Sequence, residues 1–165
     1  MGTRLVGALL ISLLGLTEPS FAASPNVPDT SRHLYDRVME EFKQGDYEAA
    51  LAGFSLFIEL HHHSALAPNA QYWMGECHYR LGRYQEALTS FSKVGSYTPL
   101  SSKHAASMFK IGLTYSRLGD HAKASLMFNR VVDEYPAGAE AALARRAMDG
   151  MIPKSQLTSL RKSQH

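Results

Sequence analysis

Apolar residues recur at helical spacing in two consecutive runs, and a short polar interval separates these runs. The two runs consist of Leu34, Val38 and Phe42, followed by Ala50, Phe54 and Phe57. A spacing of three to four residues places each run on one side of an α-helix. The interval contains Gly45, and glycine suits the left-handed position that ends many helices. The pattern therefore predicts two helices joined by a tight turn at residues 44–46.

The same pattern returns twice more, each time after 37 residues. Positions of one chemical type share this step in three units: Gly45, Gly82 and Gly119; Ala50, Ala87 and Ala124; Phe54, Phe91 and Phe128; Phe57, Val94 and Val131. A single step also relates Gly75 to Gly112, and Pro99 to Pro136. So many matches at one offset indicate an internal repeat rather than chance.

Each unit has the composition of a helical hairpin that depends on its neighbours. The repeated alanines allow two helices to approach closely, the repeated aromatics fill the space beside them, and the prolines stop the second helix. One hairpin cannot bury its own apolar face, whereas three stacked hairpins can. We therefore predict an all-α solenoid with repeats at about 31–66, 67–103 and 104–138. A further helix at 139–150 covers the last repeat, with small residues inward and Arg145 and Arg146 outward.

The ends of the chain differ from this repeated body. Arg4 precedes an apolar run of 12 residues, 5–16, which is too short for a membrane span, and small residues follow at Ser20 and Ala22. We expect residues 1–22 to be a cleaved signal peptide; the alternative is an uncleaved membrane anchor. No cysteine near this site could accept a lipid. Residues 23–30 are expected to be a disordered leader, and residues 151–165 a basic, disordered tail.

Composition narrows the function without identifying it. The net charge is +2, too small to indicate a nucleic-acid-binding protein. We find no glycine-rich phosphate loop, no paired carboxylates at helical spacing and no serine–histidine–acid signature. The sequence therefore predicts no enzyme, no cofactor and no metal site.

The repeated glycine, tyrosine, alanine, phenylalanine and proline positions resemble the tetratricopeptide repeat (TPR). The second unit carries this pattern at Gly75, Gly82, Tyr84, Ala87, Phe91 and Pro99, and the third at Gly112, Tyr115, Gly119, Ala124, Phe128 and Pro136. The first unit departs from it, with Val38, Glu41 and His62 where glycine, tyrosine and proline are expected. The period of 37 exceeds the usual TPR period of about 34.

This longer period resembles the C-terminal region of the Tol-Pal system cell-division coordinator family (YbgF/CpoB). Segment 47–58 looks like part of that family's first repeat, segment 67–76 like the opening of its second and segment 105–112 like its third. Typical members also carry an N-terminal coiled coil that forms trimers. Only the eight-residue leader, which is polar and has no heptads, separates the predicted signal peptide from the first helix here. We therefore expect a monomer.

The resemblance implies a binding groove on the concave side, lined by the first helix of each hairpin. Transferring the usual TPR groove positions gives Tyr35, Met39 and Lys43 in the first unit, Asn69, Tyr72, Glu76, Tyr79 and Arg80 in the second, and Phe109, Leu113 and Arg117 in the third. Such a groove suits a partner helix or extended segment with an apolar side and some acidic groups. Alternatively, several of the aromatics are buried between repeats, and Arg80 and Arg117 serve the dipoles of the helices that they end.

Two remaining features have weaker functional interpretations. The run 61–63 is three histidines, which could bind a transition metal, but adjacent helical positions point in different directions and favour a polar helix end instead. Cys77 is the only cysteine, and we expect a semi-buried thiol; a mixed or intermolecular disulfide is the alternative.

The sequence thus predicts a periplasmic TPR adaptor that binds proteins and catalyses nothing. The family resemblance implies partners in the Tol-Pal system, which coordinates outer-membrane constriction with cell division. The alternative is a TPR subunit of another envelope assembly, such as outer-membrane protein insertion. We expect neither nucleic-acid binding nor membrane insertion of the mature chain.

Overall fold

The computed structural model describes residues 30–97 and 101–151, and the regular elements within these ranges are α-helices. They are α1 (Thr30–Gln44), α2 (Tyr47–His61), α3 (Ala67–Arg80), α4 (Tyr84–Tyr97), α5 (His104–Arg117), α6 (His121–Glu134) and α7 (Ala139–Met151). The three first helices begin 37 residues apart, and so do the three second helices. The predicted all-α repeat architecture is confirmed. The predicted signal peptide, most of the leader, Pro99 and the tail beyond Met151 lie outside the described residues.

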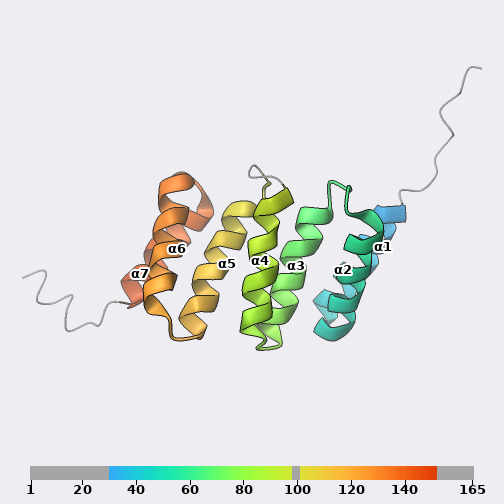
Figure 1. Ribbon diagram of the computed structural model, residues 1–165, viewed down its shortest axis with the longest axis horizontal. Helices are drawn as coiled ribbons and strands as arrows, with labels where there is room; N and C mark the ends of the chain where they lie inside the picture. The colour runs from blue at the N-terminus through green and yellow to red at the C-terminus, as the bar shows by residue number, and fades with distance from the viewer. Residues whose placement is uncertain (1–29, 98–100, 152–165) are drawn as a thin grey trace, which may run out of the picture.

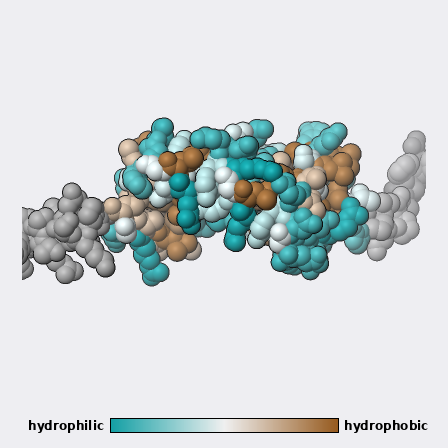
Figure 2. Space-filling model, turned by 90° about the horizontal axis from the view of Figure 1, so that it is seen from below, coloured by the Kyte–Doolittle hydropathy of each residue, from teal (hydrophilic) through white to brown (hydrophobic). Residues whose placement is uncertain are grey.

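The helices pair as hairpins and stack in chain order (Figure 1). The second helices α2, α4 and α6 lie in the front layer of this view, with α1 and α7 behind them. Each helix packs on its neighbours in the chain, and α5 also contacts α7. Among the described helices, none has the length and apolar character needed to cross a membrane. On the face seen in Figure 2, hydrophilic residues separate the apolar ones into several patches.

A glycine at the same position turns the chain inside each hairpin. Gly45, Gly82 and Gly119 have φ values of +84°, +74° and +80°. A Cβ atom at any of the three would meet nothing within 4 Å, so the space around them is open. The left-handed backbone is therefore what requires glycine here, as the sequence predicts.

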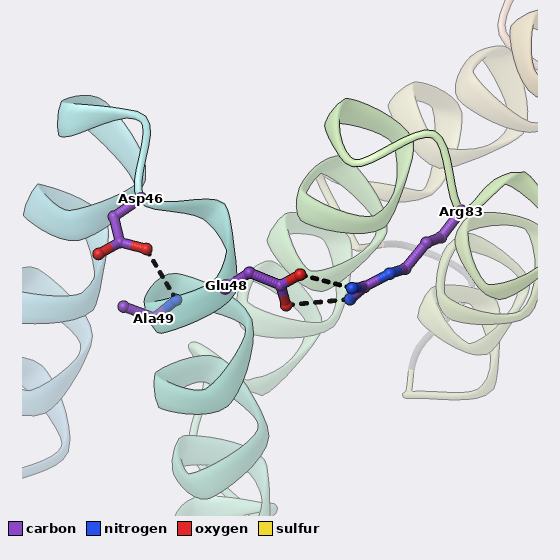
Figure 3. Close-up of polar contacts among 4 residues, drawn as sticks. All are labelled: Asp46, Glu48, Ala49 and Arg83. Atoms are coloured by element: carbon purple, nitrogen blue, oxygen red, sulfur yellow. Dashed lines mark hydrogen bonds and ion pairs between the residues drawn. The ribbon is translucent and has the colours of Figure 1, made fainter.

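The residue after this turn glycine varies, with a structural consequence (Figure 3). Asp46 caps α2 by accepting a hydrogen bond from the Ala49 backbone N–H at 3.1 Å, and Asp120 caps α6 in the same way. Arg83 holds the equivalent position before α4 and reaches the preceding repeat instead. Its guanidinium donates to both carboxylate oxygens of Glu48, at 3.0 and 2.5 Å. One repeat therefore exchanges a local cap for a contact between repeats.

Close contacts between the two helices of a hairpin explain the other repeated glycines. A Cβ atom on Gly75 would lie 2.5 Å from the Phe91 ring, and one on Gly112 would lie 2.5 Å from the Phe128 ring. The first repeat reverses this arrangement: Val38 replaces the glycine of the first helix, and Gly53 on the second helix makes room for it. The departure from the TPR pattern at Val38 is therefore compensated within its own hairpin.

Helix α7 closes the stack in the predicted way. Ala141 and Ala144 are fully buried against the third repeat, because small side chains allow close helix packing. Arg145 and Arg146 are exposed. The apolar core is thus continuous from α1 to α7 through three clusters, centred on Phe54, Phe91 and Phe128.

Candidate protein-binding groove

The first helices and α7 form one layer, which we call the first-helix layer. Side chains of α1 reach α3, and side chains of α3 reach α5. We define the first seam as the contact of repeat 1 (α1, α2) with repeat 2 (α3, α4). The second seam is the contact of repeat 2 with repeat 3 (α5, α6). Concave surfaces of helical solenoids are extended binding surfaces, so the side chains along these seams determine what the layer can bind.

The first seam is aromatic within this layer. Trp73 of α3 packs on Phe42 of α1, with 4.8 Å between ring centroids. Burial raises the pKa of the Tyr35 phenol, and a hydrogen bond from Trp73 partly opposes that rise. Leu66, just before α3, packs against the same cluster. This seam therefore joins two repeats mainly by apolar contact.

The second seam places charged groups at equivalent positions. Lys110 of α5 stands 37 residues after Trp73, and its ammonium lies 2.6 Å from a carboxylate oxygen of Glu76 on α3. The side chain of Glu76 is 4% exposed and that of Lys110 is 22% exposed, so this ion pair is largely removed from water. Burial raises the pKa of the neighbouring Tyr72 phenol, and the negative charges of Glu76 and Glu140 raise it further.

Two more cations, one at the N-cap of α5 and one in its last turn, contact aromatic residues of α3. The Lys103 ammonium lies 5.1 Å from the Tyr72 ring centroid and 5.6 Å from that of Trp73. At the other end of α5, Arg117 Nε donates to the Tyr79 hydroxyl at 3.1 Å. Lys103, Lys110 and Arg117 are seven residues apart, which keeps them on one side of the helix. We call these three residues the cation row.

The predicted groove residues differ widely in accessibility. Tyr35, Tyr72 and Glu76 are buried, with exposures of 9%, 8% and 3%. Others are half-buried: Met39, Asn69, Tyr79, Phe109 and Leu113. The remaining predicted residues are the exposed cations Lys43, Arg80 and Arg117. Their role as a partner-binding set stays a prediction, and its accessible part is narrower than the full list.

The sequence prediction omitted four residues that belong to this layer. Lys103 and Lys110 fall outside the usual groove positions but lie over α3. Leu143 and Arg146 of α7 stand one repeat step after Ala106 and Phe109 of α5, and both are exposed. Extending the 37-residue step into the closing helix would have identified the last two.

A groove also runs along the second-helix side of the first seam, between α2 and α4 over α3. It has a volume of about 380 Å³, and its lining includes Ile58, Gln71, Met74 and His78. The His78 Nδ1 atom is buried without a hydrogen-bond partner among the described residues. Burial lowers the pKa of this imidazole. The equivalent position in the second seam is Tyr115.

The structure also locates the two weaker candidates. Helix α2 ends at His61, and the His62 and His63 rings lie 3.9 Å apart beyond it. Within residues 30–97 and 101–151, no three histidine, cysteine or acidic side chains are grouped so that they could hold a metal ion. Cys77 is fully buried, and burial raises the pKa of its thiol to about 12. Because the thiolate is the reactive form, this environment disfavours disulfide formation in the folded state.

Comparison with known proteins identifies the repeat. Residues 66–136 match the tetratricopeptide repeat model, and the chain carries a TPR domain. Over 67 residues, 41% of this chain, it is 33% identical to the cell division coordinator CpoB of Pseudomonas putida. The aligned part is 25% of that relative, so the chain matches about a quarter of its length.

Solved structures share the fold at low sequence identity. The Yersinia enterocolitica type III secretion chaperone SycD, solved with a peptide of the translocator YopD, gives a TM-score of 0.64 at 20% identity, covering 80% of this chain and 96% of that one. PcrH, in complex with the chaperone-binding region of PopB, gives 0.62 at 24% identity, covering 76% and 97%. The TPR protein YrrB gives 0.60 at 24% identity, covering 70% and 57%. At these identities the likeness concerns the fold alone.

Proposed function

We propose that this protein is an exported adaptor of the bacterial envelope that binds a protein partner on its first-helix layer, and that it acts in the Tol-Pal system. The observation that carries the binding role is the row of half-buried aromatic and exposed cationic side chains on this layer, on either side of α3. Aromatic and arginine side chains contribute most to protein-interface energetics. The adaptor performs no chemistry of its own; it holds a partner in place.

Two further observations support this assignment. The matched relative is named a cell division coordinator, and this chain is 33% identical to it over 67 residues. Solved structures of the same fold hold partner segments, namely a YopD peptide on SycD and a region of PopB on PcrH. Export is supported by the sequence pattern at residues 1–22, and the Tol-Pal connection by the CpoB similarity together with the 37-residue period.

Site-specific crosslinking in living cells tests this proposal. A photoreactive amino acid replaces Leu113 on the first-helix layer or, as the control, Asn129 on the exposed side of α6. We expect adducts with Tol-Pal components from position 113 and none from position 129. Adducts that contain only outer-membrane insertion factors would instead favour the other envelope assembly. Determining the N-terminus of the purified chain tests export, with cleavage expected after Ala22.

A further inference from the structure

We propose that the second seam is the specificity-determining part of the groove, and that it takes an extended, acidic partner segment. Lys103 and Arg117 bind two carboxylates that lie six residues apart in the partner. Apolar side chains between these carboxylates rest on α3. The inference rests on the proposed function only in assuming that the first-helix layer is the binding surface.

The fold does not require cations at two of the three positions in the cation row. The first seam joins equivalent helices in the same fold, yet it has Leu66 and Trp73 where the second seam has Lys103 and Lys110; Arg117 has its equivalent in Arg80. A buried ion pair such as Glu76–Lys110 has a desolvation cost that well-packed apolar groups avoid. Lys103 and Lys110 are therefore poorly explained by stability alone, and binding of a negatively charged group explains them better.

Pairing within the seam leaves the two ends of the row available. Glu76 neutralises Lys110 in the middle. Lys103 and Arg117 face aromatic rings and a phenol hydroxyl, and neither forms an ion pair with a carboxylate in the described parts of the chain. The exposed Arg80 on α3 and Arg146 on α7 add positive charge to the layer, while the negative charge of Glu140, which acts on Tyr72, partly offsets it near Lys103. An acidic segment complements this charge distribution.

The positions of the two free cations set the spacing in the partner. Lys103 and Arg117 are separated by 14 residues, which corresponds to about 21 Å along a helix that rises 1.5 Å per residue. An extended chain covers that distance in about six residues. Residues i, i+2, i+4 and i+6 of an extended chain point to one side. The expected motif therefore has acids at i and i+6 and apolar residues at i+2 and i+4.

The surface between the two ends suits those apolar residues. The Tyr79 ring is half-buried and lies between Lys110, whose ammonium is 5.7 Å from the ring centroid, and Arg117. Because the central charge is already neutralised by Glu76, an apolar side chain can cover it with a smaller desolvation penalty than an isolated charge would impose. The middle of the seam thus favours apolar contact and its two ends favour carboxylates.

Fluorescence anisotropy with synthetic peptides tests the spacing. The probe is fluorescein-labelled Gly-Ser-Glu-Ser-Leu-Ser-Leu-Ser-Glu-Ser-Gly. One comparison peptide has glutamine for both glutamates, and the other has the same composition with the glutamates three apart, which puts them on opposite sides of an extended chain. We expect the probe to bind about tenfold more tightly than either comparison peptide. Its binding should weaken as salt rises from about 0.05 to about 0.3 M.

Matched variants of the full mature chain test the cations. Lys103→Gln with Arg117→Gln should weaken probe binding about tenfold. Lys93→Gln with Arg145→Gln removes the same charge from exposed residues that lie outside the predicted groove and should leave binding unchanged. Circular dichroism establishes that both double variants keep their helical content. Equal losses in the two double variants, or equal binding of the glutamine peptide, would overturn the proposal.

Two other outcomes separate this inference from neighbouring ideas. If the cations instead recognise an anionic membrane, the protein would bind vesicles containing about one-third phosphatidylglycerol, and the Lys103→Gln, Arg117→Gln variant would not. The protein would then show no preference among the peptides. This result would overturn the acidic-segment proposal. Crosslinks to a protein partner from position 113, without binding of the acidic probe, would contradict the spacing inference and leave the adaptor function standing. Tight probe binding without partner crosslinks would support the spacing inference and contradict the proposed adaptor function.

Discussion

The two seams join the same kind of helices at the same period, yet they use different chemistry. The first seam packs Trp73 on Phe42, whereas the equivalent pair in the second seam is Lys110 beside Tyr79. The first seam has an exposed ion pair at its edge, between Glu48 and Arg83, while the second seam has a largely buried one within its first-helix layer, between Glu76 and Lys110.

The difference distinguishes positions that the fold requires from positions at which several kinds of side chain are accommodated. Both seams rest on alanine and phenylalanine positions that are fully or almost fully buried in every repeat. The side chains that cross between the first helices can change, because either aromatic packing or an ion pair fills that space. Variation at these positions can therefore serve binding while the repeats keep their geometry.

Transferring the first-seam residues into the second seam tests whether the two kinds of contact are interchangeable. Glu76→Met alone, which copies Met39, removes the counterion of Lys110 and should destabilise the chain by about 3 kcal/mol, since breaking a buried pair leaves an uncompensated charge. Adding Lys110→Trp, which copies Trp73, should restore stability to within about 1 kcal/mol of the original. Urea unfolding measures both changes. If the double variant is as unstable as the single one, the two seams are not interchangeable.

The glycine–phenylalanine contacts inside the hairpins should not tolerate substitution, because no other side chain fits the space between the two helices. Gly112→Ala places a Cβ atom 2.5 Å from the Phe128 ring and should cost about 2 kcal/mol, despite the better helix propensity of alanine. Gly150→Ala in α7 is the matched control, since nothing lies within 4 Å of its Cβ position. The control should leave stability unchanged or slightly higher. A loss of equal size in both variants would contradict the steric explanation.

A smaller effect is expected at the edge of the first seam, where Arg83 stands at the position that is aspartate before α2 and α6. Arg83→Asp removes the exposed pair with Glu48 and introduces the cap that Asp46 and Asp120 provide in the other hairpins. Exposed ion pairs contribute little, while a helix cap is reliably favourable, so we expect a small rise in the thermal midpoint, by at most about 5 °C. Asp120→Ala should lower the same midpoint. A clear loss on Arg83→Asp would show that the contact between repeats outweighs the cap.

The smallest expected effect is a pH dependence of folding stability that arises from His78 at the first seam. Burial lowers the pKa of His78, an effect that the charge of Arg83 assists and those of Glu86 and Glu48 oppose. The His78 imidazole therefore binds a proton more readily in the unfolded chain than in the folded one. The folded state keeps its full stability above about pH 6.5 and loses part of it as the pH falls below that value. His78→Tyr, which copies Tyr115, should flatten this decline in urea midpoints between about pH 7 and pH 5. An equal flattening by His33→Gln, at an exposed histidine of α1, would contradict the assignment.

Much of the fold was predictable because its signals are local and repeated. The glycine after each first helix requires a left-handed backbone whatever surrounds it, and the step of 37 residues located every hairpin. The small residues of α7 marked a helix that covers an apolar face. For the candidate groove, the TPR pattern predicted which helices line it, but not which of its side chains are accessible.

The helical hairpins, their period, their turns and the closing helix could therefore be predicted from the sequence, because helix periodicity and backbone conformation depend on residues close together in the chain. The accessibility of the predicted groove residues depends instead on how the hairpins pack in three dimensions. Glu76 is buried because Lys110, in the next repeat, lies against it, and Arg83 is diverted to Glu48 across 35 residues. Such pairings depend on how neighbouring hairpins dock, and no local spacing records that docking. Where α3 and α5 meet, the predicted partner-binding residue Glu76 is the counterion of Lys110.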